Sequence, residues 1–549
     1  MADDLARDLI RRADALKGNR GTLESLWEEI AELVRPTREG FVRTMLTEGQ
    51  KRGLAQYDAA PASALEQLAA GLWGGATNSA TEWFSIAHPD DAVSEDREVK
   101  LWLDIARQVT ADAFAAQGQR FYTQALELYA DLGAFGTGIF FVDEDVDRRR
   151  LFFSTRNLRE CCIAQDDREA VDTVYRRFAW SAEQAMARWG DRAPEKVRKA
   201  AADGKPDTQF DFLHAVYPNR QWMPRRMDAG GKRWASVYVA LCDMSIVQRG
   251  GYEEFPYCVP RWGTTQGGLY GESPAMAALT DIKVLNAVER DKLKVGAREA
   301  QPPLLAPDEN AIRGVKLTPS GITYGGVNAD GQPLVRPLIT GSDLRVFEGM
   351  AEQKREAIRQ AFHNTLMLMA QRPNATATEV LEVKEERLRL LGPQLSRIET
   401  EFLDPLIRRV FQLLWRAQAF PPPPPALAED ARVKVEYVSQ LTVAQRSGAA
   451  AAILRGMSSV LPMAEANPAI LDNIDMDQVT RRVIAGFGAP AAILRDPRQV
   501  AAEREARAQA QAQMQQMQQV AAMAQPMAQG AKAVRDIVGA GREAAEMPA

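Results

Sequence analysis

The sequence is poor in the residue types that bind metals or form disulfides. In 549 residues it has three histidines, which are far apart: His88, His214 and His363. Its four cysteines contain no C-x-x-C pair: Cys161, Cys162, Cys242 and Cys258. Because zinc sites and disulfide scaffolds need such residues in number and at short spacings, we expect no metal site and no disulfide framework, but reduced, buried thiols.

A basic excess and a long apolar run are also missing. The net charge is −5 and the isoelectric point about 5.7, so the chain as a whole lacks the positive charge of proteins built to hold nucleic acid. No run approaches the roughly 18 apolar residues that a spanning helix needs, and the acidic start does not resemble a secretory signal. We therefore expect a soluble protein without a membrane segment, whose contacts with DNA are local or weak.

The motifs of nucleotide-dependent enzymes are absent as well. Gly231-Lys232 is followed by Arg233 and lacks the earlier glycine of a Walker loop. The glycine-rich stretch from Gly133 to Gly138 reverses the spacing of a dinucleotide fingerprint and precedes an apolar run, so we interpret it as a helix-to-strand turn. We expect no catalytic residue and no cofactor.

The apolar residues that are present indicate an α+β fold that is mainly helical. Hydrophobic residues make up 46% of the sequence, and the chain is long enough for two or more structural units. Up to about residue 135 they recur at helical spacing. From about 138 to 260, short β-branched and aromatic runs separated by turns predict a mixed sheet.

Two long helices separated by an insertion are predicted next. The first covers 273–300, since Ser273-Pro274 combines an N-cap with a proline suited to the first turn. Residues 301–341 are rich in Gly and Pro and contain an Asp330-Gly331 turn signal, which indicates a hairpin. The second helix is expected over 342–369.

A short loop at 370–375 is predicted to precede another long helix. That helix covers 376–420, begins with a capping box at Thr376-Ala-Thr-Glu379, and is expected to bend at Pro393 and Pro405. Five prolines end it, and 421–497 contains a strand-like run and further helical sequence. The Ala-, Gln- and Met-rich segment 498–549 is either a self-associating helix or disordered.

The helix over 273–300 has two distinct faces. Its apolar stripe consists of Leu279, Ile282, Leu285 and Val288. Another face carries a basic ridge of Lys283, Arg290, Lys294 and Arg298. From spacing alone the ridge is equally consistent with a binding surface and with a solvated face paired locally with Asp281 and Glu289.

Four stretches resemble the head-to-tail connecting (portal) protein family of short-tailed bacteriophages. They are Phe121 to Val142 with Tyr-x-x-Leu-Gly-x-x-Gly-x-Gly, Tyr270-Gly-Glu-Ser-Pro-Ala-Met276 into its helix and Pro302-Pro303, Asn374 through Leu391-Gly-Pro393 to Phe402-Leu-Asp-Pro-Leu406, and Val435 to Arg446. With the amphipathic N-terminus they cover most of residues 1–500. The last 50 residues carry little of the resemblance.

The resemblance implies a ring-forming portal fold of twelve subunits with wing, stem, clip and crown regions around an axial channel. The regions would be a wing (1–272), stem helix (273–300), clip (301–341), second stem helix (342–369), channel loop (370–375), kinked wing helix (376–420), wing and crown (421–497) and a crown or barrel segment (498–549). It also implies a virion location at one capsid vertex, after assembly in the host cytoplasm.

The resemblance further implies partners and site residues. The partners are other copies of the chain, double-stranded viral DNA, the terminase large subunit, the major capsid and scaffold proteins, and tail adaptor or nozzle proteins. The residues expected to line the DNA channel are Lys283, Arg290, Lys294, Arg298, Gln371, Arg372 and Asn374. Candidates for docking the terminase or tail at the clip are Glu309, Asn310, Arg313 and Lys316.

Two other functions fit the sequence less well. A DNA-packaging enzyme would need the phosphate loop or metal ligands that are missing. A tail adaptor or another ring-forming structural protein is the second alternative. Adaptors, however, are generally shorter and lack paired stem helices with a clip between them.

Overall fold

The computed structural model describes most of the chain, in the following ranges: 2–38, 40–42, 56–90, 93, 96–116, 120–145, 150–224, 226–265, 267–306, 326–328, 330–337, 344–364, 391–428, 434–437, 450–460, 462, 474–486 and 499–515. The chain forms two compact units. One comprises Met1–Pro89 and Leu103–Ala444, and the other comprises Asp90–Trp102 and Gln445–Ala549.

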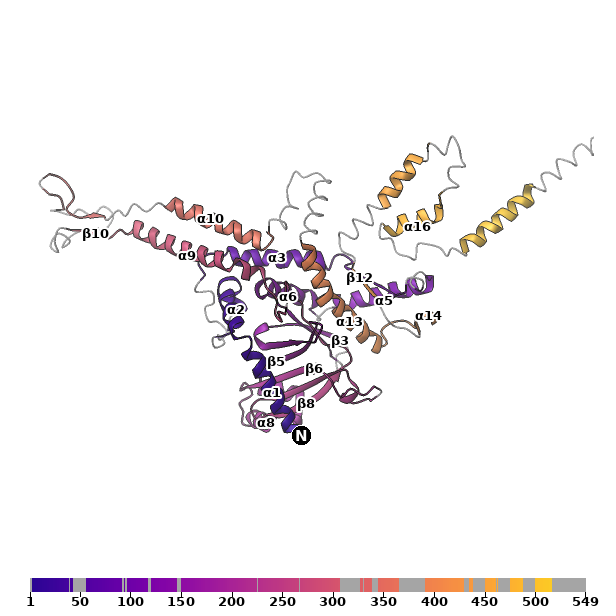
Figure 1. Cartoon of the computed structure of the whole chain (residues 1–549), viewed down its shortest axis with the longest axis horizontal. Coiled ribbons are helices and arrows are strands. Elements are labelled where there is room, and N and C mark those ends of the chain that lie inside the picture. Colours follow the sequence, from indigo (N-terminus) through magenta and orange to yellow (C-terminus); the bar gives the residue numbers. More distant parts are fainter. Residues whose placement is uncertain are drawn as a thin grey trace, which may run out of the picture. The chain divides into compact units, whose positions relative to one another are not determined.

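The described strands of the first unit form four antiparallel sheets, of which two have more than two strands (Figure 1). The larger has β4 (Cys161–Gln165), β5 (Val171–Ser181), β6 (Gln209–Pro218), β7 (Trp234–Ala240) and β8 (Ser245–Tyr252) in sequential order. The smaller has the order β3 (Arg150–Arg156), β2 (Ile139–Asp145), β9 (Tyr257–Cys258). The predicted mixed sheet is wrong, since every described strand pair is antiparallel. A parallel pair needs a long crossover connection, which is usually an α-helix. In the larger sheet only the connection between β5 and β6 contains described α-helices.

Helices cover both faces of the five-stranded sheet. On one face α1 (Ala2–Gly18) packs Leu9 and its apolar neighbours against Leu213 and Val237. On the other, α7 (Ala182–Trp189) and α8 (Glu195–Ala202) pack against Phe212 and adjacent side chains. Neighbouring strand residues therefore belong to different clusters, as the alternation of a strand requires.

A fully buried arginine joins the N-terminal helices to this sheet. Arg20 lies between α1 and α2 (Gly21–Val34) and pairs with Glu24 at 2.7 Å. Its guanidinium donates to three main-chain carbonyl oxygens, those of Leu158, Arg159 and Cys161, at 3.1, 2.9 and 2.5 Å. Because these charge-assisted bonds satisfy the guanidinium, its burial is tolerated.

An aromatic core forms between the three-stranded sheet and the helices α5 (Arg97–Ala115) and α6 (Phe121–Phe135). The ring of Phe121 lies 4.5 Å from that of Phe114 and 5.3 Å from that of Phe153. The glycine-rich turn predicted after this helix is confirmed, since Gly136 caps α6 with φ of +73° and β2 begins three residues later.

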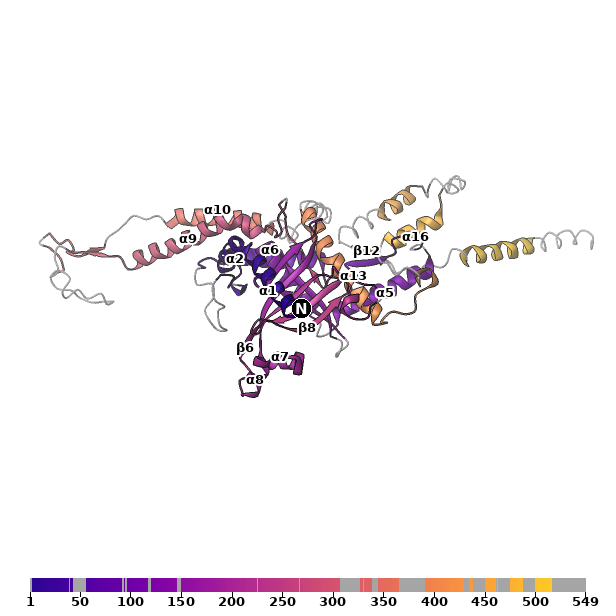
Figure 2. The same cartoon turned by 60° about the horizontal axis from the view of Figure 1, so that its bottom comes forward.

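Two antiparallel helices extend from the body of this unit. They are α9 (Pro274–Ala300) and α10 (Leu344–Ala361), which lie side by side in both views (Figures 1 and 2). Their inner ends pack on α3 (Ala60–Ala76), and α9 also contacts α2 and α6. α10 ends at Ala361, because His363 adopts φ of +56°, which helical residues do not adopt. The helix predicted over 342–369 is therefore interrupted there, and its residues 342–343 and 365–369 lie outside the described residues.

The insertion between these helices contains the expected hairpin. Strands β10 (Leu304–Leu305) and β11 (Arg336–Pro337) pair at its base. Further out, Val327 bridges Pro333 around a turn in which Gly331 has φ of +76°. The left-handed conformation explains why glycine follows Asp330.

The long helix described from residue 391 changes geometry before its second proline. A π-helical turn, Glu399–Leu403, precedes α13 (Asp404–Arg416), which has Pro405 in its first turn. The π turn accommodates the missing amide of Pro405, while the bend expected at Pro393 and Pro405 stays a prediction. Beyond the prolines lie α14 (Pro425–Ala428) and β12 (Lys434–Tyr437), and β12 pairs with β1 (Phe84–Ala87).

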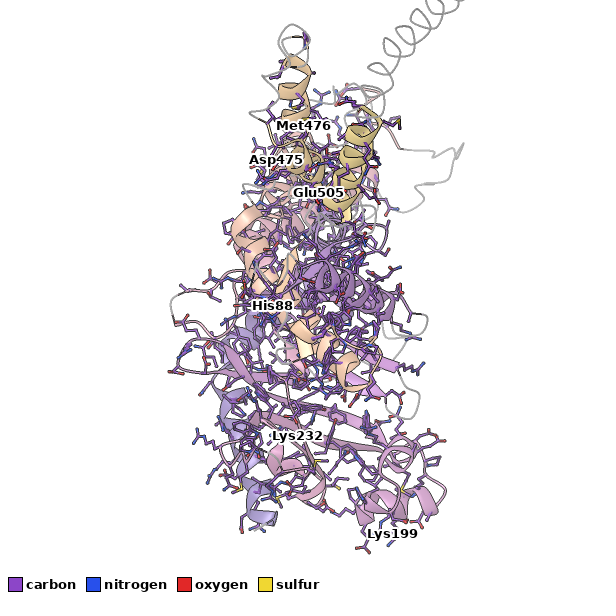
Figure 3. All side chains as sticks on the ribbon, turned by 90° about the vertical axis from the view of Figure 1, so that its right-hand side faces the viewer. His88, Lys199, Lys232, Asp475, Met476 and Glu505 are labelled. Carbon is purple, nitrogen blue, oxygen red and sulfur yellow. The ribbon has the colours of Figure 1, made fainter. Side chains whose placement is uncertain are left out.

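Beyond Gln445, the second unit is described through three helical stretches, and its other segment, Asp90–Trp102, contains the start of α5. The three stretches are 450–460, α16 (Met476–Gly486) and 499–515. Arg504 binds Asp477 through two hydrogen bonds of 2.6 and 2.8 Å, which joins the last two stretches near the labelled Asp475 and Glu505 (Figure 3). Among all described helices, none combines the length and the hydropathy needed to cross a membrane.

Candidate functional site

The start of α9 is fixed by a serine with two roles. The Ser273 hydroxyl accepts a hydrogen bond from the Met276 amide at 3.0 Å and donates one to the carbonyl oxygen of Ala134 at 2.8 Å. The predicted N-cap is therefore confirmed, and the same side chain attaches α9 to the end of α6.

The predicted apolar stripe of α9 is also confirmed, because all four of its residues are buried. From α10, Ala351 and Ile358 are fully buried as well. The two helices therefore pack through apolar faces, as amphipathic neighbours do.

Ion pairs add specificity along the same helix pair. Asp281 binds Lys354 at 2.7 Å, and Glu289 binds Arg355 at 2.6 Å. The hypothesis that these two acids neutralise the basic ridge is wrong. They lie on the side of α9 that faces α10, so their partners are the bases of that helix.

The four ridge residues of α9 differ in their partners and in their exposure, and the difference follows their position along the helix. Lys283, nearest the body, binds Glu29 of α2 at 2.5 Å. Arg290 and Lys294 both contact Asp291, each at 3.3 Å, and remain about half exposed. Arg298 is exposed in the last turn, where cations are favourable near the helix C-terminus. The outer half of α9 therefore carries three accessible cations, together with the shared acid Asp291 and the exposed acid Glu299.

Exposed apolar side chains accompany these cations, and sequence reasoning missed them. Leu293 of α9 is 60% exposed, while Val346 and Met350 of α10 are 59% and 44% exposed. Apolar groups at successive positions on one helix pair suggest an interface with another chain. Leu293 lies outside the predicted stripe, and that exception was the available signal.

The other predicted site residues lie outside the described residues. This applies to Gln371, Arg372 and Asn374 of the expected channel loop. It applies equally to the four candidates of the expected clip: Glu309, Asn310, Arg313 and Lys316.

Segments far apart in sequence meet where α9 joins the body. The amide of Gly271 donates to the Thr137 hydroxyl at 2.8 Å. The Phe402 ring of the π turn lies 5.2 Å from that of Phe140 in β2. The first of the stretches that resemble the portal family therefore contacts both the second and the third.

An ion pair reinforces this junction. Glu401 of the π turn accepts hydrogen bonds from the Arg261 amide at 2.8 Å and from its guanidinium at 2.8 Å. The Arg261 side chain is buried, and its guanidinium also donates to the Glu169 carbonyl oxygen at 3.0 Å. The π turn is therefore held to the β9 end of the sheet by charge-assisted bonds.

The cysteines show no catalytic arrangement. Cys161, Cys162 and Cys258 are buried, Cys242 is partly buried, and all four are free. Burial raises the pKa of Cys161 and of Cys258 to about 12, which suppresses the reactive thiolate. In the described part of the chain, no group of three or more His, Cys, Asp or Glu side chains is placed to hold a metal ion.

Comparison with known proteins identifies the class. The model of the bacteriophage head to tail connecting protein family matches residues 6–494, so the chain belongs to this family. It is 29% identical over 548 residues to the portal protein of Salmonella phage epsilon15, covering 98% of this chain and 96% of that protein. It is 30% identical over 538 residues to the probable portal protein of Bordetella phage BPP-1, covering 97% and 95% respectively. The resemblance found in the sequence is confirmed, and the protein functions as a portal-type head-to-tail connector.

Proposed function

We propose that twelve copies of this chain form a ring around a DNA channel at one vertex of the capsid. The ring would dock the packaging terminase, admit double-stranded DNA, later release it, and attach the tail. This proposal extends the connector function of the family to a specific stoichiometry and route. The ATPase that drives packaging would be a separate chain.

The observation that carries the proposal is the helix pair α9–α10. The pair extends from the body and ends in a hairpin-bearing segment, which fits a stem followed by a clip. Its outer half presents Arg290, Lys294 and Arg298 together with exposed Leu293 and Val346. Cations suit a channel wall, and exposed apolar groups suit a neighbouring subunit.

The charge balance supports guidance over tight binding. Twelve copies with a net charge of −5 carry about −60, so the ring as a whole would repel DNA. Each phosphate neutralised by a cation adds salt-dependent affinity that moving DNA must overcome. Three accessible cations per α9, partly offset by Asp291 and by the exposed Glu299, limit that affinity.

Electron microscopy of the purified protein tests the ring. We expect end-on views with twelve subunits and a central pore, at a mass of about twelve times 60.7 kDa. If the protein forms only monomers alone, the same count is made on rings assembled with the phage scaffold and capsid proteins. Closed oligomers without a pore would contradict the proposal.

Packaging assays test the channel wall. The combined change Arg290→Ala, Lys294→Ala and Arg298→Ala is expected to lower the DNA packaged per capsid several-fold while rings still form. Lys292→Ala is the matched control, because Lys292 lies on the same helix but binds Glu348 of α10 at 3.7 Å. Equal packaging by both variants would remove these residues from the channel.

A further inference from the structure

The longest proline run of the chain lies between α13 and β12. It consists of five consecutive residues, Pro421 to Pro425, and the sequence has one other pair of adjacent prolines, Pro302-Pro303. The ring of proline fixes its own φ, and a proline also restricts the residue before it. Each proline of the run therefore restricts its neighbour as well as itself.

The folded chain uses the run as a connection that is anchored at both ends. Before it, the Phe420 ring lies 4.9 Å from that of Phe411 in α13. After it, Leu427 of α14 is buried, and its amide donates to the Pro424 carbonyl oxygen at 2.9 Å. The run up to Pro424 is neither helix nor strand, and Pro422 is exposed. These anchoring contacts do not require a proline at every position between them.

Synthesis of the run is difficult for a chemical reason. In peptide bond formation the nitrogen of the incoming amino acid attacks the ester carbon that joins the growing chain to its transfer RNA. An amide bond forms, the ester bond breaks, and the proton of the nitrogen passes to the leaving 3′-hydroxyl. Proline attacks through a hindered ring nitrogen, and a chain that ends in proline has a restricted last residue. Both reactants are therefore poorly oriented in four successive bonds of the run.

The position of the run lies close to the boundary between the two units. Every described element of the first unit that comes before α14 precedes the run, and the main segment of the second unit, Gln445–Ala549, follows it. A ribosome that pauses at Pro421 still holds the residues made last inside its tunnel. Both larger sheets and α10, which ends at Ala361, have by then left the tunnel.

The segment made after the run exposes apolar side chains. Leu454 and Met476 are each 45% exposed, and Met514 is 60% exposed. Packing between domains that have not finished folding is a characteristic failure of multidomain chains. A delay before Gln445 is made keeps these side chains absent while the first unit buries its own core.

We propose that ribosomes pause at Pro421–Pro425 and that a host translation factor, which orients the transfer RNA carrying proline, relieves the pause. The pause lets the first unit fold before the main segment of the second unit is made. The proposal uses the family only to infer that the ribosomes are bacterial, and it holds for any number of subunits in the ring.

Ribosome positions on the messenger RNA test the pause. The native chain is translated in a cell-free system of purified bacterial components, with or without elongation factor P, the bacterial factor that assists bonds between prolines. Without the factor we expect ribosomes to accumulate several-fold over codons 421–425 relative to codons 302–303. Adding the factor should remove the accumulation. Even ribosome density over codons 421–425 without the factor would overturn the proposal.

Two variants of the same kind assign the pause to the run. Pro422→Ala with Pro424→Ala leaves no adjacent prolines there and is expected to abolish the accumulation. Pro302→Ala with Pro303→Ala is the matched control and is expected to leave it unchanged. Accumulation that persists in the first variant would assign the pause to another feature of the messenger RNA or the chain.

Titration of the factor tests the effect on folding without changing the sequence or the stability of the protein. Native chains are treated with protease as soon as they are released, and we expect the resistant fraction to fall as the factor shortens the pause. The variant without adjacent prolines at 421–425 should not respond to the factor, whereas the control variant should respond like the native chain. A resistant fraction independent of the factor, although ribosomes pause, would overturn the role in folding. Neither measurement requires rings, so its failure is distinct from failure of the proposed function.

Discussion

Gly136 and Gly271 cross with their backbones in direct contact. A Cβ atom at Gly136 would lie 2.2 Å from the Gly271 carbonyl oxygen, and one at Gly271 would lie 2.1 Å from the Gly136 carbonyl oxygen. Neither position admits a side chain. The crossing joins the turn after α6 to the segment that starts α9, so it sets where the helix pair leaves the body.

Gly136→Ala is expected to destabilise the protein by about 3 kcal/mol or more, because it combines the steric clash with an unfavourable φ. Gly204→Ala isolates the second effect, since Gly204 has φ of +75° and open space around it. That control should cost only about 1 kcal/mol. Urea denaturation midpoints provide the comparison, and equal losses would show that the crossing relaxes without penalty.

Arg355→Met is expected to destabilise the helix pair more than Lys354→Met. Arg355 binds Asp58 at 2.8 Å and Glu289 at 2.6 Å, and both carboxylates are largely buried. Its loss leaves two desolvated charges, at a cost of about 3 kcal/mol. Lys354 and Asp281 are each about a third exposed, so their pair contributes under about 1 kcal/mol. Thermal unfolding of both variants measures the difference, and a reversed order would contradict this account.

Acidification is expected to destabilise the first unit through His214. Burial, with Arg176, Arg156 and Arg188 nearby, holds the pKa of this imidazole well below its usual range. Below about pH 6.5 the unfolded chain binds a proton that the folded chain does not, so stability falls as pH falls, by up to about 1.4 kcal/mol per pH unit.

His214→Asn tests this dependence. The variant is expected to lose part of its stability at pH 7, because His214 contacts the Ser236 hydroxyl at 3.0 Å. Its denaturation midpoint should nevertheless vary less between pH 6.5 and pH 5 than that of the native protein. An unchanged pH dependence would assign the acid sensitivity to other groups.

Thiol labelling of the native protein is expected to modify Cys242 first. Burial raises the pKa of all four thiols, but Cys242 alone is partly accessible. Timed alkylation followed by mass spectrometry should show Cys161 and Cys258 labelled only after denaturation. Their rapid labelling without denaturant would indicate that the sheet core opens.

Local sequence signals predicted those parts of the fold where a residue type or a spacing is typical of one structure. Ser273 before a proline located the start of α9, Asp330-Gly331 located the hairpin turn, and the apolar stripe of α9 identified its buried face. Each of these signals depends on neighbours within a few residues. Strand direction does not, and the predicted mixed sheet was wrong for that reason.

The candidate site was less predictable because its contacts are distant in sequence. The pairing of Lys283 with Glu29 joins residues 254 positions apart, and no local pattern indicates it. The end of α10 at Ala361 was not predicted. It follows from the left-handed backbone of His363, and histidine is not a residue type that typically ends helices.

The buried Arg20 imposes an order on the folding of this chain during its synthesis. Its hydrogen-bond acceptor, the carbonyl oxygen of Cys161, lies 141 residues further on. The contacts of Arg20 between α1 and α2 therefore cannot be completed until that strand has been synthesised. At typical translation rates the delay is roughly ten seconds. During that interval the apolar face of α1 has no sheet to cover, and the nascent N-terminus is a candidate substrate for chaperones of the host.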